Sequence, residues 1–415
     1  MAMSDRWCWL PLLFPMLASA QADSTWSQHM VHKHRITLES VGAYDSNVLY
    51  NDLVMGIHRG GFLSTEVRER TLNALGSANR AGYEFSGSAS FAWGDSLFGL
   101  ADLMPRVSVA HRDLLGIRFV RDAYTLSFFG NAAFEGSTAH IGPSAFEQVQ
   151  YQTFAFGVED KRTGSFVELA IVNGRSLNTG DIPKADLYTA TDGRYLELEL
   201  DGEYQRSDTG STGFSNGIGA AITLQWKRPF RLFGMPAMGS IGIFDLGFIN
   251  WNQRSLSVDK DSTIRYEGVE VAGILDLDGL ILNENSLQDS LGLGYEPMSF
   301  LRPLPAMVEA KLEFGRRYKG IPGFERHAYA VSIDQRTLPG YIPRGTVVRN
   351  FPLSRAVLAQ VGVTYGGFGE FRARVGLEAF VQDHLSISVG TPNAVGLFSD
   401  QARGKALAGR VGVVW

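Results

Sequence analysis

Four acidic side chains occupy every second position of one short segment: Glu197, Glu199, Asp201 and Glu203. Leucine or tyrosine takes most of the positions between them, at Leu196, Leu198, Leu200 and Tyr204. Alternate side chains of an extended strand share a face at roughly 6.8 Å, twice the rise per residue. Carboxylates at that spacing repel one another unless water or cations compensate them. One interpretation is a cation-attracting wall of a water-filled lumen. The simpler one is pairing with basic side chains such as Arg372 and Arg374.

Metal-binding patterns are incomplete. His29, His32 and His34 have a spacing that could gather imidazoles, but no nearby cysteine or aspartate completes a metal site. Asp259 and Asp261, and later Asp276 and Asp278, lack the third acid and the spaced glutamate of a calcium loop. We interpret the histidines as a solvated segment and the aspartates as solvated loop carboxylates, so no metal ligand is predicted.

Catalytic motifs are absent from the sequence. It contains no G-x-S-x-G, no H-E-x-x-H and no phosphate-binding loop. Asp383 and His384 are adjacent, so in a strand they would point to opposite faces and could not form a dyad. We therefore expect a protein that is not an enzyme, with no catalytic or cofactor-binding residues and no cofactor. The mild net charge of −5 also gives no basic surface for nucleic acid.

The elements that carry these side chains are strands with one apolar and one polar face. In residues 83–93 the odd positions include Tyr83, Phe85 and Phe91, while the even positions are mostly serine. Residues 307–318 and 370–381 alternate in the same way, with Arg372, Arg374 and Glu378 opposite aliphatic side chains. An apolar face with aromatics at both ends is typical of a strand that crosses a lipid bilayer, and the charged face of such a strand lines the lumen.

The last eleven residues form one more strand of this kind. Leu407, Val411, Val413 and Trp415 share its apolar face. A terminal amphipathic strand with a final aromatic residue is similar to the signal that the outer-membrane assembly machinery reads. Phenylalanine is the commoner final residue, and a strand of a soluble sandwich is the alternative.

The N-terminus reads as a cleaved secretory signal peptide. Arg6 precedes a short apolar run that contains Pro11 and Pro15, and the run ends in an A-x-A box at residues 18–20. We expect cleavage after residue 20 or 22, which would remove Cys8, the only cysteine. The remainder has no run of 18 apolar residues, so a helical span is not predicted. An exported chain that crosses a membrane without helices must do so as a closed barrel.

These observations predict an all-β fold. We expect a transmembrane antiparallel up-and-down β-barrel of about 14 strands (12–16) in one domain, residues 23–415, within the cell outer membrane. Helical spacing at residues 65–77, 121–130 and 285–293 predicts a few short periplasmic or luminal helices. Residues 45–80 are a candidate helical plug or periplasmic segment. The 47 glycines and an aromatic content of 11% fit many strands and tight turns.

Several short stretches resemble a Bacteroidota outer-membrane family classed as a domain of unknown function, near the PorP/SprF-like and FadL-like barrels. The longest is Ile243-Phe244-Asp245-Leu246-Gly247-Phe248-Ile249-Asn250-Trp251-Asn252, and others are Ser77-Ala78-Asn79-Arg80-Ala81-Gly82 and Phe156-Gly157-Val158-Glu159-Asp160-Lys161-Arg162. The resemblance implies a porin-like barrel of unassigned role and supplies no catalytic residues. It is evidence about fold more than about function.

Three functional hypotheses follow. The first is a non-enzymatic barrel that serves transport or anchors surface, secretion or gliding components. The second is a FadL-like channel for hydrophobic solutes, which needs an apolar lumen and a plugging N-terminal segment. The third is a soluble periplasmic β-sandwich that binds a ligand, which needs apolar strand faces buried between two sheets. The expected partners are outer-membrane lipid and the assembly machinery.

Overall fold

The computed structural model describes residues 34–415 except residues 61, 95, 98, 101, 192, 209–213, 267–295, 319–325 and 383. The predicted signal peptide, His29 and His32 therefore lie outside the described residues. So do Asp276, Asp278 and the predicted helix at residues 285–293.

Fourteen antiparallel strands close into one barrel. In barrel order they are β1 (His34–Ser46), β2 (Asn79–Trp93), β3 (Leu103–Phe119), β5 (Ser144–Asp160), β6 (Phe166–Thr189), β8 (Gly217–Leu232), β9 (Met235–Trp251), β13 (Met307–Tyr318), β14 (Arg326–Arg336), β15 (Ile342–Pro352), β16 (Val357–Gly367), β17 (Arg372–Val381), β18 (Leu385–Thr391) and β19 (Gly404–Val414). Pairing of β19 with β1, from Arg35↔Val414 to Asp45↔Gly404, closes the barrel. The predicted antiparallel barrel is confirmed, and the described strands do not form the two separate sheets of a sandwich.

One rim of the barrel, here called the terminal rim, holds both described ends of the chain. The backbone N–H of His34 donates to the carbonyl of Trp415 at 3.1 Å, and Trp415 donates back at 3.2 Å. Tight connections gather at this rim. The shortest is Phe233-Gly234 between β8 and β9, where φ is +50° and +78°. Positive φ at both central residues is typical of the two-residue hairpin turn whose twist matches the strands.

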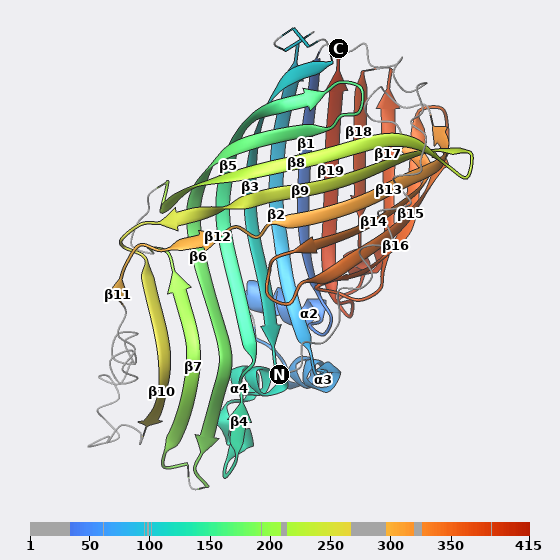
Figure 1. Ribbon diagram of the computed structural model, residues 1–415. Helices are drawn as coiled ribbons and strands as arrows, with labels where there is room; N and C mark the ends of the chain where they lie inside the picture. Colours follow the sequence, from blue (N-terminus) through green and yellow to red (C-terminus); the bar gives the residue numbers. More distant parts are fainter. Residues whose placement is uncertain are drawn as a thin grey trace.

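Short helices lie at the opposite rim, here called the far rim (Figure 1). They are α2 (Asn51–His58), α3 (Thr65–Ala74), α4 (Arg121–Phe129), the 3₁₀ helix η3 (Asn131–Phe134) and α6 (Ala394–Phe398). The predicted helices at residues 65–77 and 121–130 are confirmed as α3 and α4. Apolar side chains of α2, α3, α4 and the loops beside them pack together around Leu53, Leu75 and Tyr124, so these helices form a small core of their own. Within the described residues, no helix is long and apolar enough to cross a membrane.

The strand β6 extends beyond the closed barrel at the far rim. Its first part, Phe166–Gly174, pairs with β8, and its later part pairs with β7 (Leu196–Arg206). The outer edge of β7 pairs with β10 (Leu256–Tyr266). These segments form the sheet extension at the lower left of Figure 1. Three short strands complete the sheet: β4 (Thr138–His140), β11 (Glu296–Pro297) and β12 (Leu301–Pro303).

Strand alternation sorts the side chains onto two faces, as the sequence predicted. Large apolar side chains on the outer face stay exposed around the barrel, including Phe85, Ile171, Leu224, Val331, Val363, Leu377, Val389 and Leu407. Aromatic contacts mark both ends of this belt. Trp415 stacks near His34 and Phe91 at the terminal rim, and Tyr365 contacts Phe371 at the far rim. The inner face carries hydroxyl and charged side chains.

Candidate functional site: the lumen of the barrel

An apolar cluster fills the far-rim half of the lumen and is here called the lumen plug. It comprises Leu114, Val149, Tyr151, Val172, Leu177, Ala221, Ile249, Trp251, Leu304, Leu338 and Phe368. Most of these side chains come from the inner faces of β3, β5, β6, β8 and β9. Leu338 and Phe368 come instead from turns of the opposite wall, after β14 and β16. These two turns therefore fold inward across the lumen.

Two glycines allow the turns to approach the opposite wall. A Cβ at Gly116 of β3 would lie 2.6 Å from the carbonyl oxygen of Pro339 and 2.9 Å from the Cβ of Leu338. A Cβ at Gly82 of β2 would overlap the Phe368 ring. Real Cβ atoms do not reach such distances, so larger residues at either position would push the turns out of the lumen.

A polar cavity of about 510 Å³ lies inside the barrel between the lumen plug and the terminal rim. Serine and threonine side chains line one wall, including Thr37, Ser86, Ser88, Ser90 and Ser108. Charged side chains line the rest, among them Arg35, Glu39, Glu84, Arg106, Arg112, Glu168, Lys227, Asp245, Glu309, Arg336 and Arg410. No lining residue comes from residues 47–78. The helices α2 and α3 of that segment lie at the far rim (Figure 1), and a role of residues 45–80 as a helical plug or periplasmic segment stays a prediction.

Ion pairs cross the lumen where the cavity meets the plug. Arg336 of β14 lies 3.4 Å from Glu84 of β2, and these two strands are diametrically opposite in barrel order. Arg112 of β3 lies 3.3 Å from Asp245 of β9, which also accepts a 3.0 Å hydrogen bond from the buried hydroxyl of Tyr151. Each contact joins strands that are not neighbours, so together they hold the lumen closed at this level.

Asp245 has an unusual backbone. Its φ is +55° although it is not a glycine, and it interrupts the regular pairing of β8 with β9 between Ile222 and Leu224. Such a conformation costs of order 1–3 kcal/mol and persists only where surrounding contacts enforce it. Here the bulge turns the carboxylate of Asp245 into the lumen. Simple alternation could not reveal this position, because the bulge changes the face that each residue occupies.

Arg372 and Arg374 alternate along β17 with the exposed apolar side chains of Val375 and Leu377, and they differ in their contacts. The guanidinium of Arg372 donates to Asp45 at 2.7 Å and to the carbonyls of Ser46 and Arg403. It therefore ties the loops of the far rim to β17. Arg374 makes no hydrogen bond or ion pair within the part of the chain that the structure describes. Neither side chain contacts the acidic face of β7.

The acidic side chains Glu197, Glu199, Asp201 and Glu203 lie on the sheet extension, outside the closed barrel, and their exposure to the lumen stays a prediction. Glu199 lies 2.5 Å from Lys184 of β6. On the other side, β10 places Asp261 opposite Asp201 and Asp259 opposite Glu203. Asp259 and Asp261 are therefore strand residues, and their interpretation as loop carboxylates is corrected. Attraction of cations by this face stays a prediction.

His140 of β4 joins the same extension. Its Nδ1 lies 2.7 Å from Asp186 of β6, and its backbone N–H donates to Asp122 of α4 at 2.9 Å. The hydrogen bond to Asp186 raises the pKa of His140 above the ordinary imidazole value, and the charge of Asp186 adds to the effect. Protonation of this exposed histidine therefore favours the docking of β4 on β6.

The C-terminal residues Leu407, Val411, Val413 and Trp415 occupy the outer face of the closing strand, as the sequence predicted for a single apolar face. Val411 pairs with Leu38 and Val413 with Ile36, so apolar residues continue across the closure. Recognition by the assembly machinery stays a prediction.

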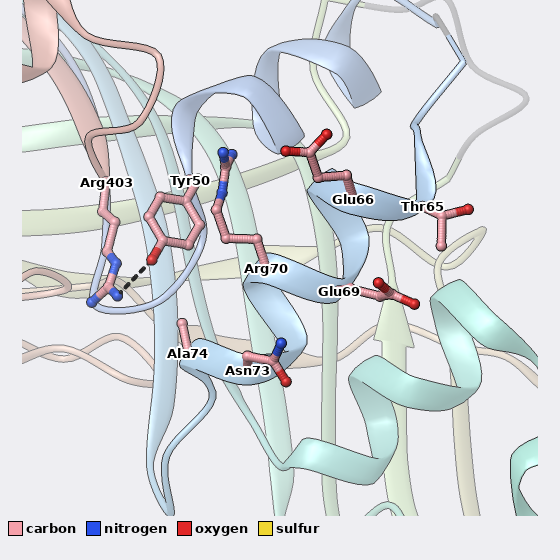
Figure 2. A pocket seen from close by; sticks show the side chains of 8 residues that line it. All are labelled: Tyr50, Thr65, Glu66, Glu69, Arg70, Asn73, Ala74 and Arg403. Carbon is pink, nitrogen blue, oxygen red and sulfur yellow. Dashed lines mark hydrogen bonds between the residues drawn. The ribbon is translucent and has the colours of Figure 1, made fainter.

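An open surface pocket of about 690 Å³ lies at the far rim beside α3 (Figure 2). The guanidinium carbons of Arg70 and Arg403 lie 4.6 Å and 4.9 Å from the centroid of the Tyr50 ring. Arg403 also donates to the Tyr50 hydroxyl at 3.1 Å, and Arg70 pairs with Asp52. Figure 2 shows Tyr50 between the two arginines. Their charges are thus used to hold α3 against the loop before β19. Within the described residues no group of acidic, histidine or cysteine side chains could hold a metal ion.

No protein-family model and no curated protein sequence matches the chain. Solved structures of outer-membrane barrels align along most of it. The translocator domain of the autotransporter NalP from Neisseria meningitidis has 7% identity, covers 98% of this chain and 96% of its own, and gives a TM-score of 0.32. A deltaS2 mutant of the monoaromatic hydrocarbon channel TodX has 8% identity, coverage of 95% and 91%, and a TM-score of 0.43. The toluene transporter TbuX of Ralstonia pickettii has 8% identity, coverage of 94% and 92%, and a TM-score of 0.35. All three scores are below 0.5, so no functional argument rests on them, and the resemblance to the Bacteroidota family stays a prediction.

Proposed function

We propose that the protein is a non-enzymatic barrel of the outer membrane whose gated polar chamber passes small polar solutes. One observation carries the proposal: a closed barrel presents exposed aliphatic side chains outward and encloses a charged, hydroxyl-rich cavity of about 510 Å³. Apolar side chains facing lipid and polar side chains facing water are what a closed transmembrane barrel requires. In water, so large an apolar belt would promote association.

The orientation follows from the connections. Transmembrane barrels of this class have short periplasmic turns and longer extracellular loops. The terminal rim, with its tight turns, then faces the periplasm, and the helices and sheet extension face the cell exterior. This orientation favours an exterior placement of the helices over the predicted periplasmic or luminal one, which stays a prediction.

The polar lining argues against a FadL-like channel for hydrophobic solutes. Apolar side chains in the lumen pack against one another as the lumen plug and leave the open volume to serines and charges. An apolar solute would have to displace water from charged side chains of the cavity wall such as Glu84 and Arg336, which is costly.

A scaffold for secretion or surface partners is the second candidate function. The occluded far-rim half of the lumen and the sheet extension of β6, β7 and β10 favour it. Anchoring needs no open pore, whereas transport does.

A single set of measurements separates these candidates. Purified protein is first tested for a faster-migrating band without boiling, which reports a folded barrel. It is then inserted into planar phosphatidylcholine bilayers. Transport predicts ion conductance that rises when the plug is weakened by Leu338→Ala with Phe368→Ala. Absence of conductance in both proteins would contradict the transport proposal and favour the scaffold.

A further inference from the structure

The wall of the polar chamber nearest the terminal rim is cationic. Lys227 of β8 and Arg35 of β1 both line the cavity, although their strands are not neighbours in the barrel. The Lys227 Nζ and an Arg35 guanidinium nitrogen lie 3.6 Å and 3.8 Å from the same point, where a Cβ on Gly164 would be. The two cationic groups therefore converge beside the turn between β5 and β6.

The acidic groups around Lys227 are already paired with other cations. Arg35 and Arg106 both pair with the fully buried Glu159, and Arg106 also pairs with Glu168 at 2.8 Å. Glu313 lies 3.1 Å from Lys311. On the closing strands Glu39 lies 3.2 Å from Arg410. Each of these acids is thus compensated without Lys227.

Lys227 itself has no ion pair or hydrogen bond from its ammonium group among the described residues. Its charged neighbours in the lumen are Arg35, Arg410, Lys311 and the paired Glu313. An ammonium group removed from bulk water and surrounded mainly by cations is unfavourable until an anion joins it. The chamber therefore lacks a negative charge at this point.

Neutral hydrogen-bond donors line the same cavity as Lys227. Thr37, Ser90 and Ser108 occupy one register row across β1, β2 and β3, and all three line the same cavity. Gln225 lies two residues from Lys227 on the same face of β8. Hydroxyl and amide groups can donate hydrogen bonds to oxyanions without adding charge, and charge-assisted bonds from lysine and arginine are the stronger ones.

We propose that Lys227 and Arg35 form a binding site for a small oxyanion, such as inorganic phosphate or a carboxylate, inside the lumen. The inference deepens the proposed function, because it names the class of solute that the chamber receives. It would stand as a binding site even if the barrel did not conduct.

The test measures binding of radiolabelled inorganic phosphate to the detergent-purified full-length barrel by equilibrium dialysis, with unlabelled succinate as a competitor. Wild type is expected to show one saturable site per chain. Lys227→Gln should weaken binding at least tenfold, while Lys227→Arg should retain most of it. Displacement by succinate would indicate a general carboxylate and phosphate site, and its absence would restrict the site to phosphate.

The matched control is Lys405→Gln on β19. Lys405 is a lysine at the far rim of a barrel strand, pairs with Asp400 at 3.1 Å and does not line the chamber, so its variant should bind like wild type. Every variant is checked for the heat-modifiable band. If Lys227→Gln does not fold, Arg35→Lys supplies the second test, with an expected several-fold loss of affinity.

Equal phosphate affinity in wild type and Lys227→Gln would overturn the inference, as would no saturable binding of labelled phosphate to wild type. The conductance measurement tests transport separately from the oxyanion site. A conducting barrel that binds no oxyanion would refute only this site, and a non-conducting barrel that binds phosphate would refute only transport.

Discussion

Two valines on the outer face of β17 test whether that face lies in lipid. Val375 and Val381 share the face and are similarly exposed, at 42% and 49%. From Phe371 to Val381 the strand runs roughly 34 Å at about 3.4 Å per residue. A tilt of about 40° reduces this to roughly 26 Å along the barrel axis, close to the ~25 Å height of an apolar belt. Val375 then lies near mid-height and Val381 at the terminal interface.

Val375→Arg should therefore lower the free energy of unfolding by about 2–4 kcal/mol, whereas Val381→Arg should lower it by about 0–1 kcal/mol. The assay is guanidinium unfolding of the protein in phosphatidylcholine vesicles, followed by tryptophan fluorescence. If the outer face were in water, both substitutions would change the free energy by about 0.5 kcal/mol or less. Equal, small effects of the two substitutions would refute the membrane placement.

Three further predictions follow from the lumen and the extension. Arg336→Ala should lower the free energy of unfolding by about 1–3 kcal/mol, because it removes the guanidinium that pairs with Glu84 across the lumen. Addition of Glu84→Gln should recover part of the loss in the same vesicle assay, and no recovery would argue against the cross-lumen pair. Asp261→Asn should stabilise the sheet extension by about 0.2–1 kcal/mol, because it removes a like charge opposite Asp201. The measurement is amide hydrogen exchange in β7, which should become slower, and faster exchange would contradict the prediction. His140 should titrate in NMR above its ordinary pKa, and Asp186→Asn should return it to that value. Because the pKa of His140 is raised in the folded protein, the stabilisation from this contact is complete below about pH 6.5, the ordinary histidine pKa. The stabilisation is lost as the pH rises through the folded pKa. An unchanged His140 pKa in Asp186→Asn would exclude the contact.

The alternation of apolar and polar residues predicted most of the barrel correctly. Successive side chains of a strand point to opposite faces, so the sequence alone places Phe85, Leu377 and Leu407 on the apolar face. Short elements were predicted less well. The helix α6 was missed because its five residues are too few to show helical periodicity.

The sequence determined that this chain makes amphipathic strands in a number that closes a barrel, because side-chain alternation is a local property of the backbone. Which strands enter the barrel was decided only by tertiary pairing. The acidic strand β7 has the pattern of a barrel strand, yet β6 turns it onto the extension. The pairs of side chains that meet inside the lumen likewise could not be predicted from the sequence. Glu84 meets Arg336, and Lys227 meets Arg35, only because the closed barrel brings distant strands face to face across a narrow interior.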